Sequence, residues 1–251
     1  MTLITDVRSG QKSDIGRKRV GKPNQDRLGS YEPVSPSCPD FLYVVCDGMG
    51  GYKGGEIASQ LAVATIVKTY RELADELSAP QILREAIKRA HEAIRQYHKA
   101  GSLGSMGTTA VVAAIRGERL YVANVGDSRA YILRQGKLRQ ITEDHSKVSA
   151  LVRAKVITAE EAKTSKVRNE LNRSLSAART EIEADIFEED FRDGDALVLC
   201  SDGLWGPAGD ANIRAIVSKL PPEAAAERLI QIANQAWGPD NISAIIVRRG
   251  E

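Results

Sequence analysis

Three aspartates stand at the ends of apolar segments, where a carboxylate is costly to bury. Asp47 and Asp202 each close such a segment and are followed directly by glycine. Asp240 precedes Asn241 just ahead of the apolar run 242–247. Short β-branched runs predict buried strands, and a carboxylate there needs a positive partner, yet neither Lys nor Arg adjoins any of the three in the sequence. Clustered carboxylate oxygens suit hard cations such as Mg²⁺ or Mn²⁺. The sequence therefore predicts an acidic metal site assembled from distant parts of the chain.

Composition and charge narrow the class of protein. The 251 residues are 42% hydrophobic and 27% charged, which is typical of a globular enzyme and disfavours disorder. The 35 basic and 33 acidic residues leave a net charge of +2 without a long basic stripe, so no nucleic-acid partner is expected. No apolar segment has membrane-spanning length and the first residues lack a signal-peptide core, so no membrane association is expected.

The three cysteines occur at no metal-binding spacing and favour a reducing, cytoplasmic setting. Two of them, Cys46 and Cys200, lie close to the aspartates of the predicted site. We interpret both as small buried strand residues, with a redox role as the alternative.

The order of apolar patterns predicts blocks of strands and helices. Two helices, over about 57–68 and 80–97, are expected to form an antiparallel pair that covers a sheet. Strands at 109–115, 120–125 and 130–133, joined by short turns, predict successive antiparallel hairpins. Further strands are expected at 2–9, 26–31, 41–47, 182–186 and up to about 248, and further helices at about 158–161 and 222–236. We find neither a repeat nor a linker, so residues 1–251 are predicted to form a single domain.

Several short motifs follow one another in a characteristic order. They are Asn24-Gln25-Asp26, Asp47-Gly48-Met49-Gly50-Gly51, Gly54-Gly55-Glu56-Ile57-Ala58-Ser59, Val125-Gly126-Asp127-Ser128-Arg129, Ser201-Asp202-Gly203-Leu204-Trp205 and Asp240-Asn241. Each alone is weak, because Asp-Gly is common in turns. Together they resemble the metal-dependent serine/threonine protein phosphatases of type 2C (the PPM family), in the bacterial form, from about residue 14 to 247. The resemblance implies an α+β fold, a four-layer α/β/β/α sandwich of two antiparallel sheets flanked by pairs of antiparallel helices.

The resemblance also implies a role for each acid. Asp47 would bridge two Mg²⁺ or Mn²⁺ ions, and the Gly48 carbonyl would bind one of them. Asp202 and Asp240 would complete the other ion, and Asp26 would orient a metal-bound water. The catalytic residues implied in this way are Asp47, Asp202 and Asp26.

Two further site residues have open alternatives. Asp127 matches the acid that, with the Asp202 position, holds a third ion in bacterial relatives; the alternative is a turn acid that caps Ser128-Arg129. The arginine that usually binds substrate phosphate is replaced by Gly21 in this chain. Arg19 is our choice for that role, because a guanidinium fits phosphate oxygens. Arg17 and Lys22 remain open, as does a merely solvated basic loop.

Other departures concern the periphery of the site. Tyr52 stands where bacterial relatives have His, and its role is open. The polar segment 146–180 falls where the family has a flap beside the active site. We predict that this flap sorts phosphoprotein substrates through its basic residues, which are Lys155, Lys163, Lys166 and Arg168.

The function implied is metal-dependent hydrolysis of phosphoserine and phosphothreonine in proteins by a metal-activated water. The expected partners are phosphorylated proteins, opposite a Ser/Thr kinase, and the chain is expected to be a monomer. A pseudophosphatase that only binds phosphoproteins is one alternative, although the intact Asp47, Asp202 and Asp240 argue against it. A two-metal nuclease is the other, and the near-neutral charge disfavours it.

Overall fold

The structure, a computed structural model, describes residues 7–32, 40–50, 53–101 and 104–250. Its strands form two antiparallel sheets. The first sheet has the order β1-β12-β11-β7-β8, with bounds Val7–Asp14, Ile242–Arg249, Ala196–Cys200, Arg129–Arg134 and Lys137–Gln140. The second has the order β10-β6-β5-β3-β4-β9, with bounds Asp185–Asp190, Arg119–Val125, Ala110–Arg116, Asp40–Gly50, Met106–Thr108 and Leu175–Ser176. Off this path, β2 (Asp26–Tyr31) pairs with β3.

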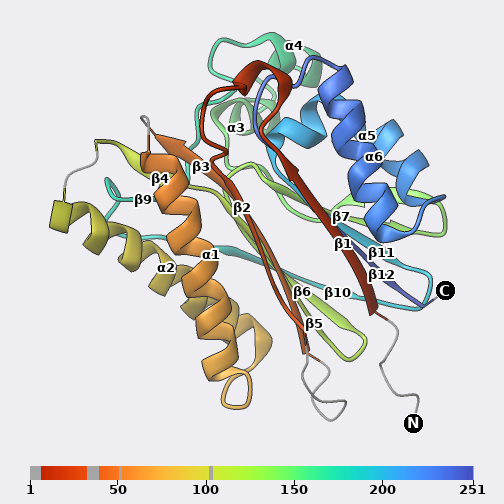
Figure 1. Cartoon of the computed structure of the whole chain (residues 1–251), viewed down its shortest axis with the longest axis horizontal. Helices are drawn as coiled ribbons and strands as arrows, with labels where there is room; N and C mark the ends of the chain where they lie inside the picture. The colour runs from red at the N-terminus through yellow and green to blue at the C-terminus, as the bar shows by residue number, and fades with distance from the viewer. Residues whose placement is uncertain (1–6, 33–39, 51–52, 102–103, 251) are drawn as a thin grey trace.

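Helices cover the outer face of each sheet, which makes four layers (Figure 1). Helices α1 (Gly54–Leu73) and α2 (Ala79–Gly101) pack as a pair on the second sheet. On the first sheet lie α5 (Asp202–Val217) and α6 (Pro222–Gln235). The smaller helices are η1 (Arg17–Arg19), α3 (Lys147–Arg153) and α4 (Ala159–Thr164). Among the described residues, none of the helices is both long and apolar enough to span a membrane.

The apolar strands supply two cores at once, because their side chains alternate between faces. In β3, Leu42, Val44 and Cys46 pack under α1 and α2. The alternate residues Tyr43 and Val45 pack between the sheets. Strands β11 and β12 divide in the same way between the inter-sheet core and the core under α5 and α6. Continuous apolar runs are therefore the expected sequence of central strands that are covered on both faces.

Most of the predicted elements are confirmed, with two corrections in the strands. The first strand is described from Val7 and continues to Asp14, beyond the predicted end at residue 9, and residues 2–6 of the prediction lie outside the described chain. Its sequence is mostly polar and half-exposed because it is an edge strand whose register is set by pairing with β12. Similarly, β10 begins at Asp185, so the alternation at 182–186 overlaps only its start.

The predicted run of hairpins is correct for β5–β6 and for β7–β8 but wrong between β6 and β7. These two strands lie in different sheets, and residues 126–128 carry the chain from one sheet to the other. The backbone of Gly126 has φ of 111° there, a conformation that glycine adopts readily. The loop that contains Asp127 is thus a crossover between sheets and not a hairpin turn.

Helix α5 was not predicted from periodicity. Gly206, Pro207 and Gly209 are poor helix formers, and the helix is kinked at Gly209, where φ is 70°. Its first turn lies against the start of β12, since a side-chain carbon on Gly203 would come within 2.0 Å of the Asn241 carbonyl oxygen. The glycine after Asp202 therefore permits close packing of a helix on a strand.

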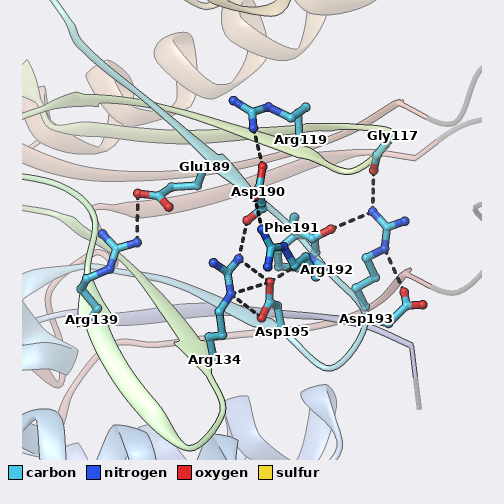
Figure 2. Close-up of polar contacts among 11 residues, drawn as sticks. Gly117, Arg119, Arg134, Arg139, Glu189, Asp190, Phe191, Arg192, Asp193 and Asp195 are labelled. Atoms are coloured by element: carbon cyan, nitrogen blue, oxygen red, sulfur yellow. Dashed lines mark hydrogen bonds and ion pairs between the residues drawn. The ribbon is translucent and has the colours of Figure 1, made fainter.

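An ion-pair cluster lies where β6 begins and β7 ends (Figure 2). Arg134 in β7 binds Asp195 through Nε and Nη2, at 2.9 and 2.7 Å, and the Asp195 side chain is only 3% exposed. Arg249 in β12 donates to the carbonyl oxygens of Phe191 and Gly117. These contacts fasten the connection between β10 and β11, which belong to different sheets. The predicted metal site lies at the opposite end of the sheets. Asp40 pairs with Arg116 beside the β5–β6 turn, on the side of this cluster, whereas Asp47 lies near the other end of β3.

Candidate active site

The predicted acids come together at one end of the two sheets. Asp26 in β2 lies directly opposite Asp47 in the antiparallel register of β2 and β3, which places their side chains roughly 5 Å apart at Cβ. The Ser201 hydroxyl, one residue before Asp202, donates to Oδ2 of Asp26 at 2.7 Å. The register of one sheet and the end of a strand in the other thus bring three acids into one cluster.

Asp240 joins the cluster through its neighbour. The backbone N–H of Gln25 donates to the side-chain Oδ1 of Asn241 at 2.8 Å. The backbone N–H of Asn241 donates to Oδ1 of Asp240 at 2.7 Å. Asp240 comes from the loop between α6 and β12, whereas Gln25 directly precedes β2. The Asn of the Asp-Asn motif therefore serves as a clamp between the sheets.

Asp127 is linked to Asp47 through hydroxyl groups. The Asp47 amide donates to Oγ1 of Thr109 at 2.9 Å, and Oγ1 of Thr109 lies 2.7 Å from Oγ of Ser128. The indole Nε1–H of Trp205 donates to the Asp127 carbonyl at 2.9 Å. These bonds fix the Asp127 loop beside the other acids, as the predicted third-ion role requires.

Burial and mutual repulsion set the charge state of the acids. Burial is the largest cause of every shift: it raises the pKa of Asp26 to about 7, that of Asp202 to about 6 and that of Asp127 to about 8. Neighbouring carboxylates add to each rise, Asp240 acting on Asp202 and Asp202 acting on Asp127. The pKa of Asp47 is raised well above its ordinary value by burial and by the charges of all four other acids.

The residues present fit hard divalent cations. Oδ1 of Asp26 and Oδ1 of Asp202 are both buried without a hydrogen-bond partner in the described chain, which is costly unless something positive meets them. Across the described residues, no group of three or more His, Cys, Asp and Glu side chains is placed so that it could hold a metal ion by itself. The donor set therefore suits an ion completed by a backbone carbonyl and water, as Mg²⁺ prefers.

Gly48 is suited to supply such a carbonyl. A side-chain carbon on Gly48 would come within 2.1 Å of the Gly55 carbonyl oxygen and within 2.6 Å of that of Gln25. The end of β3 thus packs backbone to backbone against the first turn of α1, and only glycine fits.

Arg19 reaches the acids, unlike the other two candidates for phosphate binding. Its Nε and Nη2 lie 2.9 and 2.5 Å from Oδ1 of Asp240. Arg17 and Lys22 are exposed, and within the described residues their side chains contact none of the acids of the cluster. Asp240 therefore does have a cationic partner, although no Lys or Arg adjoins it in the sequence. The pairing spans 221 residues, so no local pattern could reveal it.

His145 is a residue at the site that sequence reasoning did not assign a role. Its Nδ1 accepts from the Gly126 amide at 3.2 Å, so Nε2 carries the proton and donates to Oδ2 of Asp185 at 3.0 Å. The His145 carbonyl accepts from the Asn172 amide at 2.7 Å. The start of the predicted flap segment 146–180, and Asn172 within it, are thereby tied to the loop that carries Asp127. Its place ahead of the polar segment was the only available signal.

Two further expectations can be compared with the structure, whereas a third cannot. Tyr52 lies outside the described residues. The capping box predicted at 158–161 is present, with Thr158 and Glu161 bonded reciprocally. Cys46 and Cys200 are fully buried core residues, and burial raises the pKa of both thiols, which agrees with the packing interpretation.

Comparison with known proteins identifies the family. The family profile described as "Protein phosphatase 2C" matches residues 16–236. The serine/threonine phosphatase stp of Listeria monocytogenes is 36% identical over 238 residues, which are 93% of this chain and 93% of that protein. The serine/threonine protein phosphatase PstP of Mycobacterium tuberculosis is 36% identical over 250 residues, 98% of this chain and 45% of that longer protein.

Solved structures agree in fold. The serine/threonine phosphatase of S. agalactiae superposes with a TM-score of 0.89 at 30% identity, over 97% of this chain and 99% of that one. The catalytic domain of PstP, solved in complex with two manganese ions, superposes with a TM-score of 0.84 at 32% identity, over 98% and 99% of the two chains. On this evidence the chain belongs to the protein phosphatase 2C family and is a serine/threonine phosphatase.

Proposed function

We propose that residues 1–251 form a single catalytic domain that hydrolyses phosphoserine and phosphothreonine in proteins at a binuclear Mg²⁺ or Mn²⁺ centre. Two such cations, when bound, would neutralise the phosphoryl oxygens and activate a water as the nucleophile. The two manganese ions in the PstP structure support this assignment. Asp47, with the Gly48 carbonyl, and the pair of Asp202 and Asp240 are the proposed ligands.

One observation carries the assignment of Asp47 as the central ligand. Asp47 lies directly opposite Asp26 in the register of β2 and β3, and the charges of the other four acids all raise its pKa. A bridging ligand must stand between the other donors, and this electrostatic position fits that requirement. Its amide is held by Thr109 and its carbonyl accepts from the Thr108 hydroxyl at 2.9 Å, so the strand that carries it is rigid.

Asp26 and Arg19 are proposed to act on water and on substrate. Asp26 keeps one oxygen on the Ser201 hydroxyl and leaves the other free to orient a water. Arg19 keeps donors to spare beyond its contact with Asp240, and its fork fits two phosphate oxygens. A cation bound at Asp240 would weaken the ion pair and release the guanidinium toward the substrate.

The remaining assignments complete the proposal. Asp127 would hold a third, weaker ion together with Asp202. We also propose that the protein is a cytoplasmic monomer that removes phosphate groups added by a Ser/Thr kinase. The flap hypothesis also remains a proposal, although Lys163 is already paired with Glu160 at 2.7 Å and is a weaker candidate than the other three basic residues.

Hydrolysis of a phosphothreonine peptide, measured with Mn²⁺, with Mg²⁺ and with EDTA, tests the function. We expect phosphate release only with a divalent ion, and a loss of at least about 100-fold in kcat for Asp202→Ala. The number of Mn²⁺ ions bound by each aspartate-to-alanine variant gives a readout that does not depend on turnover. Asp47→Ala should lose both tight ions, whereas Asp127→Ala should keep two. Normal Mn²⁺ binding without turnover would instead indicate a pseudophosphatase.

A further inference from the structure

Trp237 combines two unfavourable features beside the active site. Its side chain is 72% exposed, which places a large apolar indole in water. Its backbone has φ of 85°, a conformation that is strained for a non-glycine residue. Neither feature contributes to a core. Strain and exposure of this kind, side by side, indicate a residue retained for binding.

A second exposed apolar residue and a row of cations lie on the turn 17–22, whose Lys18 amide is bonded to the residue after Trp237; Trp237 and this turn are called the patch. Val20 is 76% exposed, and the Lys18 Nζ lies 4.6 Å from the centre of the Trp237 ring. Arg17, Lys18 and Lys22 are exposed, and no ion-pair partner for them is found within the described ranges. Among those residues only four large hydrophobic side chains are exposed, and two of them, Val20 and Trp237, belong to this patch.

The patch is fixed to the active site by backbone contacts. The Lys18 amide donates to the Gly238 carbonyl at 3.0 Å, and the Arg17 amide donates to Oδ1 of Asn234 at 3.0 Å. In Figure 1 the turn that contains η1 lies beside the chain that connects α6 to β12. Between the two segments, the Arg19 guanidinium rests on Asp240. A substrate phosphate held by Arg19 would therefore lie within a few residues of the indole, since an extended chain covers roughly 3.3 Å per residue.

We propose that Trp237, Val20 and Lys18 form a docking surface for the phosphoprotein segment that flanks the phosphorylated residue. The surface takes an apolar side chain on the indole and Val20, and an acidic side chain on the unpaired cations. This inference rests on the proposed function, because it assigns a sequence preference to the same reaction. The cations of this surface complement the negative charge of a phosphorylated segment, and the surface is continuous with Arg19. Both features favour a substrate segment over a second copy of this chain.

The chain itself offers a variant that removes the indole without endangering the fold. Trp237→Gly relieves the positive φ, so its Tm should equal or exceed that of the wild type. Tyr97→Ala is the matched control, because Tyr97 is 42% exposed and lies on α2, away from this surface. Lys18→Ala tests the cationic part separately.

The assay compares phosphothreonine peptides in which one leucine or one aspartate is moved through the three positions on either side of the phosphoresidue, in an otherwise alanine background. We expect the wild type to prefer leucine at a defined position by about tenfold in kcat/KM, as one aromatic contact would give. Trp237→Gly should abolish that preference by raising KM for the leucine peptide, whereas KM for an aryl phosphate, which has no flanking segment, should stay unchanged. Lys18→Ala should reduce the preference for aspartate. Tyr97→Ala should keep both preferences.

The outcomes separate this inference from the proposed function. If the wild type hydrolyses none of the peptides with Mn²⁺, the proposed function itself fails. If it hydrolyses all peptides equally, or if Trp237→Gly keeps the leucine preference, only the docking surface is refuted. Sedimentation of the wild type as a dimer that Trp237→Gly converts to a monomer would show that a second copy covers this surface and would overturn the proposal.

Discussion

Replacing Asp202 by asparagine should stabilise the metal-free protein and weaken the metal-loaded one. Without a cation, the Asp202 carboxylate has one buried oxygen without a hydrogen-bond partner and is repelled by the charge of Asp240. Burial, followed by the charge of Asp240, raises the pKa of Asp202 from 3.8 to about 6. A raised pKa means that the folded state favours the protonated carboxyl, which asparagine imitates in shape and charge.

The magnitude follows from the linkage between proton binding and folding. A carboxyl with a raised pKa in the folded state destabilises the fold as the pH rises through that value and has no such effect below the unfolded-state pKa. For Asp202 the cost above about pH 7 is about 3 kcal/mol, or roughly 6–12 °C in Tm for a chain of this length. In EDTA at pH 8, Asp202→Asn should therefore be more stable than the wild type by this amount, and the difference should vanish near pH 4.

Urea unfolding in EDTA and in Mn²⁺, at pH 4 and pH 8, measures the effect. Saturating Mn²⁺ should reverse the ranking, because the wild type gains binding energy that the variant has lost. Asp240→Asn should give a smaller gain, because it removes only the charge that Asp240 exerts on Asp202 and at the same time breaks the ion pair with Arg19. If Asp202→Asn and the wild type were equally stable in EDTA at pH 8, the view that the metal-free site strains the fold would be refuted.

Three further predictions concern packing. Gly203→Ala should lower stability by at least about 2 kcal/mol, because its new carbon would lie 2.0 Å from a carbonyl oxygen at the start of β12. Gly206→Ala in the same helix meets nothing within 4 Å and should be neutral or stabilising by up to about 1 kcal/mol; urea unfolding compares the two. The two buried cysteines should resist N-ethylmaleimide at pH 8 until urea unfolds the protein, as peptide mapping would show, since burial raises the pKa of both thiols. Arg134→Gln should cost about 3 kcal/mol by leaving its carboxylate partner buried and unpaired, whereas Arg192→Gln, 66% exposed, should cost less than about 1 kcal/mol; equal losses would contradict this account.

The sequence was sufficient to predict the acids but not the contacts that place them. Asp47 and Asp202 could be found because each closes an apolar run, which is a local pattern. The ion pair of Arg19 with Asp240 and the bond of His145 with Asp185 join residues 221 and 40 positions apart, and such contacts leave no local trace.

The layered architecture required the family resemblance for the same kind of reason. The apolar runs of β3 and β11 predict strands covered on both faces, but they do not show which sheet each strand joins. The crossover at Gly126 was mistaken for part of a hairpin run because β6 and β7 are as close in sequence as paired strands usually are. Helix α5 was missed because the residues that break its periodicity, Gly206 and Pro207, stand within it.

The burial that strains the metal-free site also determines how the site works. Each acid lies where strands from both sheets end, and its neighbouring residue is bonded to the next segment, as Ser201 is to Asp26 and Asn241 is to Gln25. Oδ1 of Asp26 and Oδ1 of Asp202 are buried, so their charges act through a medium of low polarity, where attraction to a divalent cation is strong. When the cation is removed, the repulsion between the carboxylates is therefore opposed only by these hydrogen bonds, which also join the two sheets. Metal affinity and fold stability should consequently change together in any variant of these bonds, and Ser201→Ala, which alters no ligand, should weaken both.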